Sequence, residues 1–337
     1  MKKTLSTFFI VSIILSLMSC NKDNFGDSSV VTISRISFPS PPIEICTSSE
    51  LGVQFINYFN IVKVRDDMFY MYYQAFDGEV FHNDFDQNIY FAYSTDGFHW
   101  KHERPGHMNN IILRNVVEMS VFRVPDETYP FRLIGNVLRD QDQITSECNR
   151  TLCIWKSKDG LLFEQKSILL DDVVHDTQNV MLVYNNYMKL YTRDWIWGEI
   201  NNKRQLLNRK VAVCNFDFNG KQLTSLEMLP MDHLYNSAAS LYKGYELLFP
   251  TYFDEIEGGT DSCYVKNYIV NNGVVKELEC EFNNCLQSDE NWVIISPGII
   301  EINNRTYISY VTNTASHDNQ DTGKEESRFK LVEIKFD

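Results

Sequence analysis

Runs of alternating apolar and polar residues, rich in β-branched and aromatic side chains, recur along the chain after residue 30. Such runs are typical of β-strands, and no segment has the spacing and length of a helix. Pairs of strongly hydrophobic runs flank short polar turns at Asp66-Asp67, Asp126-Glu127, Asn185-Asn186, Lys243-Gly244 and Asn303-Asn304. Successive turns are 60, 59, 58 and 60 residues apart. The pattern therefore predicts an all-β fold of five similar repeats.

A second series of turns runs in step with the first, at Asp96-Gly97, Asp159-Gly160, Asn219-Gly220 and Asn272-Gly273. Asp-Gly and Asn-Gly favour type I′ hairpins, in which both central residues have positive φ. Each repeat is thus expected to form four antiparallel strands, A to D, with a short A–B turn, a longer B–C loop and a short C–D hairpin. Five such sheets arranged radially make a five-bladed β-propeller.

The B–C loops are the long connections, and they must all lie at one end of the blades. They are Phe76–Gln87, Arg139–Cys148, Asp194–Asn208, Tyr252–Asp261 and Thr312–Ser327. Long loops on a rigid scaffold carry function more often than tight turns do. We call their end of the molecule the loop face, and the end with the A–B turns and C–D hairpins the turn face. The binding site is expected at the mouth of the central channel on the loop face.

Composition and charge limit the classes of protein to which the chain can belong and the kinds of partner that it can bind. The chain is 44% hydrophobic and 23% charged, which excludes disordered, collagen-like and coiled-coil proteins. Its formal net charge of −14 makes nucleic acid and anionic membrane surfaces poor partners. Aromatic residues make up 13% of the chain and suit both strands and the flat faces of sugars. We expect a monomer.

The N-terminus has the features of an export signal. Lys2 and Lys3 precede an apolar run, Phe8 to Met18, that is short for a transmembrane helix. The run ends at Leu17-Met18-Ser19-Cys20, which resembles the bacterial lipobox. The alternative is an ordinary secretory peptide with a chance cysteine. We therefore expect a signal peptide over residues 1–19, a lipidated Cys20 with a tether over 20–45, and a single propeller domain over 46–337. The resemblance implies a lipid anchor in the bacterial membrane, expected to be the outer membrane on its periplasmic or cell-surface side.

Seven cysteines follow Cys20, and an exported chain can oxidise them. Cys148 and Cys153, or Cys280 and Cys285, are close enough in sequence to form a disulfide across a hairpin. The odd number leaves at least one thiol free. We favour buried thiols, and no cysteine–histidine cluster has the spacing of a zinc site.

The string FAYSTDGFHW (91–100) follows FYMYY (69–73), and WKSKDGLLF (155–163) repeats it in blade two. These hairpin strings resemble those of five-bladed glycoside hydrolases, especially families 43 and 32 and poorly characterised relatives from Bacteroidota. HDTQNV (175–180) with LYTR (190–193), and DHLYN (232–236) with YELLFP (245–250), are similar to blades three and four. The resemblance spans roughly residues 50–337. The SxDG strings lack the extra residue of a sialidase Asp box, so we interpret them as hairpin chemistry.

In these families an Asp at the start of blade one is the base or nucleophile, a Glu of blade three is the acid, and an Asp of blade two assists. Counting back eight or nine residues from each A–B turn places two carboxylates at the channel, Glu118 and Asp176. The blade-one Asp is absent, and Asn57 or Gln54 stands near its place. Glu118 and Asp176 either form the acid/base pair, or hydrogen-bond backbone or arginine at the channel wall.

Further residues fall at the same mouth and are candidates for binding sugar. Arg193 and Asp194 end the B strand of blade three; the arginine either binds substrate or neutralises a carboxylate. Trp195 either stacks on a sugar or packs under a loop. The remaining candidates, each with a structural alternative, are His175, His233, Tyr235 and His317.

The sequence thus supports a glycoside hydrolase that acts on a glycan by carboxylate acid/base catalysis. The alternative is a catalytically inactive carbohydrate-binding lipoprotein, which the missing blade-one Asp favours. A propeller used for protein contacts would not require an aromatic, polar channel. No cofactor is expected; some relatives hold a divalent ion in the channel, but no ligand cluster here demands one.

Overall fold

The computed structural model describes residues 33–53, 56–76, 87–138, 150–171, 179–200, 203–231, 234–236, 238–254, 262–271, 274–280, 293–313 and 327–337. By its internal contacts the chain divides into two units, Met1–Ile33 and Ser34–Asp337. All the described strands belong to the second unit. Over the described ranges, no helix is long and apolar enough to cross a membrane.

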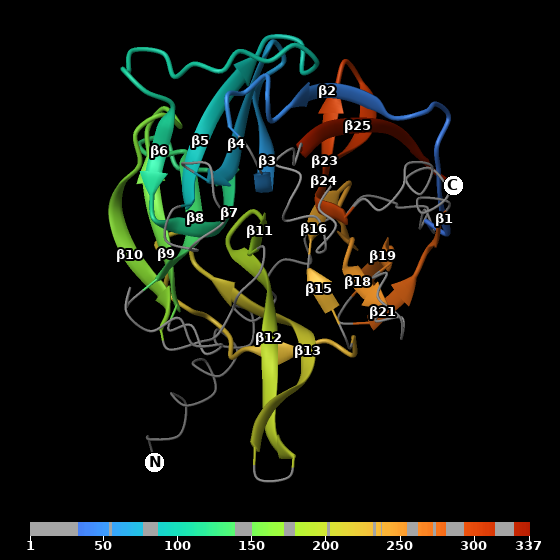
Figure 1. Cartoon of the computed structure of the whole chain (residues 1–337). Helices are drawn as coiled ribbons and strands as arrows, with labels where there is room; N and C mark the ends of the chain where they lie inside the picture. Colours follow the sequence, from blue (N-terminus) through green and yellow to red (C-terminus); the bar gives the residue numbers. More distant parts are fainter. Residues whose placement is uncertain are drawn as a thin grey trace, which may run out of the picture. The chain divides into compact units, whose positions relative to one another are not determined.

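Five antiparallel sheets surround a central axis, so the predicted five-bladed β-propeller is confirmed (Figure 1). The innermost strand of each sheet contacts the innermost strands of both neighbours, and β23 contacts β3 to close the ring. Blade one contains β3 (Ile56–Arg65), β4 (Met68–Phe76), β5 (Gln87–Ser94) and β6 (Ile111–Arg114). Blade two contains β7 (Val116–Arg123), β8 (Phe131–Leu138), β9 (Arg150–Ser157) and β10 (Glu164–Leu170). Blade three contains β11 (Val180–Val183), β12 (Met188–Ile200), β13 (Lys203–Phe216) and β14 (Glu227–Met228).

Blade four is split into two sheets at a proline. Pro250 separates β17 from β18, because a proline has no N–H to donate to the strand ladder. The main sheet contains β16 (Ala239–Tyr242), β17 (Tyr245–Leu248), β20 (Tyr268–Asn271) and β21 (Val274–Glu277). The small sheet contains β15 (Leu234–Asn236), β18 (Thr251–Asp254) and β19 (Ser262–Val265).

Blade five takes its outer strands from the other end of the chain. It contains β23 (Val293–Ile302), β24 (Arg305–Asn313) and β25 (Ser327–Phe336), and β25 then pairs with both β2 (Ile43–Thr47) and β1 (Arg35–Ser37). β1 also pairs in parallel with β22 (Glu279–Cys280), which follows the outer strand of blade four. Residues 35–45, expected as tether, therefore contribute strands to the propeller. The N-terminal strands fasten the last blade to the ring.

The inner strands are buried on both faces, because every sheet packs between two neighbours. β5 is buried along almost its whole length, whereas the first five residues of β10, at the outer edge, are exposed. Tyr72 and Phe91 belong to the core between blades one and two. Met71 and Tyr73, one position along on β4, belong to the core between blades one and five. Successive side chains of these strands therefore point into two different cores, rather than alternately into one core and into solvent.

Among the described residues, two consecutive positive φ values, as a type I′ turn requires, occur at the A–B turns of blades four and five and not at the C–D hairpins where they were predicted. Lys243 and Gly244 have φ of 47° and 83°, and Asn303 and Asn304 have 50° and 62°. In the described C–D hairpins only the glycines have positive φ. There Ser94 Oγ accepts the Gly97 N–H at 2.9 Å and Asp96 Oδ1 accepts the Phe98 N–H at 2.8 Å. Blade two repeats this arrangement, so the SxDG strings do encode turn chemistry.

The hairpin glycines of blades one, two and three also lock each of these blades to the one before it in the ring. A Cβ on Gly160 would lie 2.7 Å from Tyr72 Oη in blade one, and this hydroxyl donates to the Gly160 carbonyl at 2.8 Å. A Cβ on Gly97 would lie 2.6 Å from Ile302 Cδ1 in blade five. Gly220 of blade three sits against Leu169 of blade two in the same way. Glycine is required at these positions by its φ and by the space.

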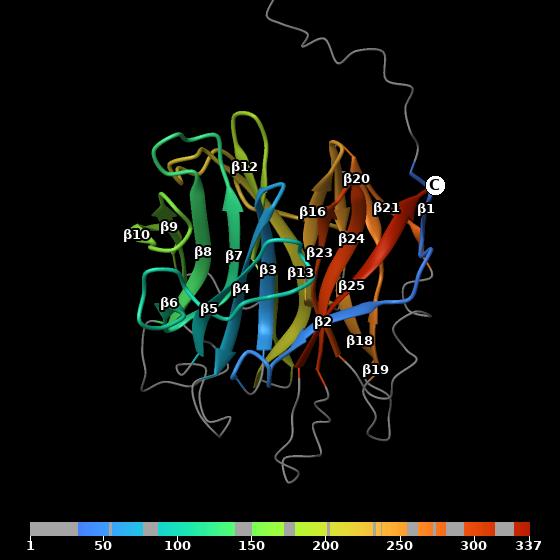
Figure 2. The same cartoon turned by 90° about the horizontal axis from the view of Figure 1, so that it is seen from above.

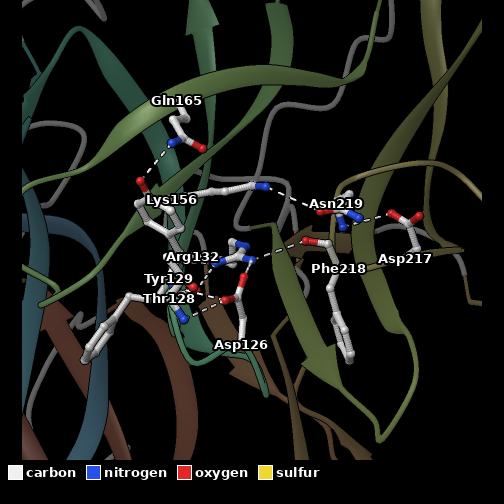
Figure 3. A network of polar contacts seen from close by, with 10 residues as sticks. Asp126, Thr128, Tyr129, Arg132, Lys156, Gln165, Asp217, Phe218 and Asn219 are labelled. Atoms are coloured by element: carbon white, nitrogen blue, oxygen red, sulfur yellow. Dashed lines mark hydrogen bonds and ion pairs between the residues drawn. The ribbon is translucent and has the colours of Figure 1, made fainter.

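A buried arginine joins blades two and three near the turn face (Figure 3). Arg132 on β8 is fully buried. Its guanidinium donates to Asp126 Oδ2 at 2.8 Å, to the Phe131 carbonyl at 3.1 Å and to the Phe218 carbonyl of blade three at 3.4 Å. Asp126 also accepts the backbone N–H groups of the turn that follows it. The charge is buried only because several acceptors surround it.

Cys46 and Cys214 are buried free thiols and Cys153 is also buried, and burial of the thiols is what the sequence favoured. Cys153 lies in the core between blades one and two, whereas Cys148 lies outside the described residues, so a disulfide between them stays a prediction. Burial raises the pKa of Cys214 to about 12. Such a thiol is inert toward oxidants at neutral pH.

We predict that Gly160→Ala lowers the free energy of unfolding by about 2–4 kcal/mol, since it adds a clash with Tyr72 to the strain of a positive φ. Gly106→Ala is the matched control, because Gly106 has a φ of 77° but nothing within 4 Å of a Cβ. It should cost only about 1 kcal/mol. Urea unfolding followed by fluorescence measures both. Equal losses would show that the glycine does not lock the blades.

We also predict that the stability of the protein falls at acidic pH and that this fall depends on Asp126. The Tyr129 N–H and the Arg132 guanidinium lower the pKa of Asp126 from 3.8 to about 2. A lowered folded-state pKa stabilises the protein above the unfolded pKa, and this stabilisation is lost as pH falls from about 4 to about 2. Asp126→Asn should flatten the dependence of the melting temperature on pH in that window. Asp67→Asn, at the exposed A–B turn of blade one, should leave it unchanged.

Candidate functional site

Glu118 lies near the start of β7, the innermost strand of blade two, where the strand departs from regular geometry. Its φ is 57°, in the left-handed region that non-glycine residues rarely adopt. The register between β7 and β8 shifts between Val117 and Ser120, which marks a β-bulge. A bulge turns a side chain away from the direction that the ladder would give it. The Glu118 N–H donates to the Gln74 side chain of blade one instead.

The Glu118 carboxylate is held by two donors of its own blade. Asn136 Nδ2 on β8 donates to one oxygen and Arg150 Nη1 at the start of β9 donates to the other. The side chains of Arg150 and Glu118 are only 7% and 6% exposed. Removing either partner of such a pair would leave an uncompensated buried charge.

Buried amides extend this arrangement to blades one and three. In blade one, Gln74 Nε2 donates to Gln87 Oε1. In blade three, Asn179 donates to the Glu118 carbonyl from its N–H at 3.5 Å and its Nδ2 at 3.4 Å. Asn179 Oδ1 in turn accepts the Thr192 hydroxyl at 2.6 Å. We call Gln74, Gln87, Glu118, Asn136, Arg150, Asn179 and Thr192 the Glu118 network.

The Glu118 network lies toward the loop face of three neighbouring blades. Gln74 is near the end of β4, Asn136 is near the end of β8, and Arg150 begins β9, so all three flank B–C connections. All seven members are buried. The network presents a fixed anion with its hydrogen bonds satisfied within the protein. It can orient and stabilise charge, but with both oxygens accepting hydrogen bonds it is not poised to donate a proton.

Of the two alternatives that the sequence left open for Glu118, the structure contains the second, in which the carboxylate is paired with an arginine. Arg193 is 3% exposed and follows Thr192 on β12. Asn57, Asp194, Trp195 and Tyr235 lie on β3, β12 and β15, and only their backbone is described. The other predicted residues lie outside the described ranges: Cys20, His175, Asp176, His233 and His317. The acid/base pairing of Glu118 with Asp176 thus stays a prediction.

The third B–C connection is not the loop that was predicted. β12 and β13 remain paired from Met188↔Phe216 to Ile200↔Lys203, and they project as a two-stranded arm (Figure 1). The alternating segments on either side of residues 201–202 were the available signal for this hairpin.

Sequence reasoning also missed Arg150 and the buried amides of the Glu118 network. An isolated Gln or Asn in an otherwise apolar B strand, as at Gln74 and Asn136, was a usable signal. Among the residues that the structure describes, no three His, Cys, Asp or Glu side chains form a metal-binding group.

No protein-family model matches the chain, and no curated protein has a significantly similar sequence. Its fold does match solved structures. A family 117 glycoside hydrolase from Zobellia galactanivorans is 11% identical, with a TM-score of 0.55 over 90% of both chains. The α-L-arabinanase of Cellvibrio cellulosa, complexed with arabinohexaose, is 8% identical, with a TM-score of 0.54 over 84% of this chain and 93% of that chain.

A GH32 β-fructofuranosidase from Bombyx mori is 14% identical, with a TM-score of 0.55 over 83% of this chain and 60% of that chain. Identities this low show a shared fold and nothing finer. The predicted resemblance to propeller glycoside hydrolases is confirmed at that level.

We predict that Glu118 and Arg150 are strongly coupled in a double-mutant cycle. Glu118→Gln and Arg150→Met should each cost about 3–5 kcal/mol, because each leaves a buried charge or donor without its partner. The double variant should recover a coupling energy of at least about 2 kcal/mol. The control is the more exposed pair Arg305–Glu333, at 3.2 Å, whose coupling should stay below about 1 kcal/mol. Urea unfolding gives all the values, and additive losses at Glu118 and Arg150 would contradict the pairing.

Proposed function

We propose that this protein is a glycoside hydrolase whose active site lies at the loop face of the channel. The observation that carries the proposal is Glu118, a buried anion on a left-handed backbone, held by residues of three blades. Strain and buried charge both cost stability, and such costs concentrate at functional sites. The described fold is shared with an arabinanase and a family 117 glycoside hydrolase, which supports a glycan as the substrate.

The two carboxylates are proposed to have different roles. Glu118, already occupied by Arg150 and Asn136, acts as a fixed anion that stabilises positive charge on the sugar in the oxocarbenium-like transition state. Asp176 is the candidate for proton transfer. It precedes Asn179 by three positions, and three residues span at most about 10 Å. Because Asn179 hydrogen-bonds Glu118, this chain length supports placing both groups at one site.

Sugar binding is assigned to the residues that surround these two carboxylates. We include Arg193, which is buried beside Thr192 of the Glu118 network. Asn57, Asp194, Trp195 and Tyr235 begin or continue strands at the loop face. His175, His233 and His317 complete the set, on the sequence argument alone.

A second candidate function is carbohydrate binding without catalysis. The Glu118–Arg150 pair favours it, since a carboxylate with two donors is not available as an acid. The absence of an Asp where related families carry their base favours it as well. The two candidates differ in whether the glycan is cleaved, so one set of variants separates them.

The N-terminus supports a proposed location for the protein. We include export and lipid attachment at Cys20, supported by the basic start, the apolar run and the position of Cys20 after it. The anchor would hold the propeller at a bacterial membrane surface, with the outer membrane as the proposed site.

We predict that the purified protein releases sugar from at least one member of a panel of aryl glycosides and plant polysaccharides. Asp176→Asn should lower kcat by about 10²–10⁴-fold, the usual contribution of a positioned acid or base. Glu118→Gln should lower kcat with little change in KM, because it removes charge felt mainly in the transition state. Glu164→Gln, an exposed carboxylate on outer strand β10, is the control and should be fully active.

Affinity electrophoresis in polysaccharide gels provides the parallel measurement of binding. Retardation without any hydrolysis, equal in wild type, Asp176→Asn and Glu118→Gln, would establish the binding protein instead. Circular dichroism of each variant separates loss of activity from loss of fold.

A further inference from the structure

The chain enters the propeller at the turn face. Ser34 and Arg35 donate their N–H groups to the carbonyl of Asp337 at 2.8 and 3.2 Å, and Ile36 pairs with Phe336. β25 starts at Ser327, opposite Asn313 on the loop face, and ends after it passes the A–B turn of blade five. Figure 2 shows β1 beside this C-terminal end, at the opposite end of the blades from β19.

The same face carries exposed apolar side chains at successive hairpins. Leu162, Leu223 and Val274 are 49%, 51% and 68% exposed, at the C–D hairpins of blades two, three and four. A single exposed apolar residue needs no explanation. Three on the C–D hairpins of neighbouring blades form a repeated feature of one face. We call them the apolar tips.

The length of chain before the propeller limits how the molecule can stand on a membrane. Thirteen residues, 21–33, separate Cys20 from Ser34. A flexible chain of that length has a root-mean-square span of about 20 Å. The ten-residue strands β3 and β25 imply a distance of about 33 Å between the two faces. Bringing the loop face to the bilayer would therefore require a tether stretched well beyond its average span.

We propose that the turn face rests on the lipid surface to which Cys20 is attached, with the apolar tips at the headgroup level and the channel mouth directed away from the bilayer. The inference rests on the lipid attachment proposed above. Lys158 and Lys221 lie on the same hairpins as two of the tips and can reach headgroups. Asp66, Asp67 and Glu127 share the face, so the contact depends on the anchor and the tips rather than on charge.

Lysine footprinting of the full-length lipidated protein on phosphatidylcholine–phosphatidylethanolamine vesicles tests the orientation. A membrane-impermeant acetylating reagent is applied to vesicle-bound wild type and to the soluble Cys20→Ala variant, and modification is read by mass spectrometry. Lys158, Lys221 and Lys243 should react about threefold or more slowly on vesicles. Lys203, at the end of the β12–β13 arm, should react equally in both states.

Two further variants test the role of the apolar tips. Leu162→Asp should reduce the protection of Lys158. Ile168→Asp, at a residue of the same blade that is 56% exposed on outer strand β10, should not.

The outcomes are separable. Wild type that does not float with vesicles overturns the anchor, and this inference with it. Wild type that floats but shows protection at Lys203, or equal reactivity of the three turn-face lysines in both states, overturns the orientation alone. Neither result bears on hydrolysis, which is measured separately.

Discussion

Closure of the ring is the constraint on which the rest of this structure depends. Strands such as β5 and β7 are buried along nearly their whole length, because each sheet is covered by a neighbour on both faces. A blade without its neighbours would expose two apolar faces, so the blades are stable only together. β1 and β2 complete blade five, the last blade of the ring, by pairing with β25. The hairpin glycines keep the blades close, since a larger side chain at Gly160 or Gly97 would push two sheets apart.

A ring that is rigid in this way can hold polar groups that a looser fold could not. The two ends of the blades use buried arginine differently. Near the turn face, Arg132 is surrounded by backbone carbonyls and by Asp126, in a local arrangement that joins two blades. Toward the loop face, Arg150 meets Glu118 on a strained backbone, with amides from neighbouring blades around it. Only the second arrangement adds conformational strain to burial, which is why the functional proposal is placed there.

Sequence reasoning could predict the fold because a short polar turn between two apolar strands recurs in all five blades at nearly the same interval. It could also find Glu118, since counting from the A–B turns needs no knowledge of the loops. Arg150 was not predicted, because it follows a B–C connection whose length differs between blades. β1 and β2 were not predicted, because strands of three and five residues beside prolines show little periodicity. Their partner β25 is also nearly three hundred residues away in the sequence. The β12–β13 arm was not predicted, because its segment of alternating residues was interpreted as a loop.

The residues that complete the last blade also determine where the N-terminal segment joins the propeller. Because β1 completes the last blade beside the end of β25, the chain that leads from Cys20 must join the molecule at the turn face. The B–C connections, and with them the Glu118 network, necessarily lie at the other end of the same strands. A propeller closed by its C-terminal strand alone would place no such condition on its N-terminus. In this chain the strand that completes the fold also determines the end of the propeller at which residue 34 joins it, and this end is opposite the one that carries the Glu118 network.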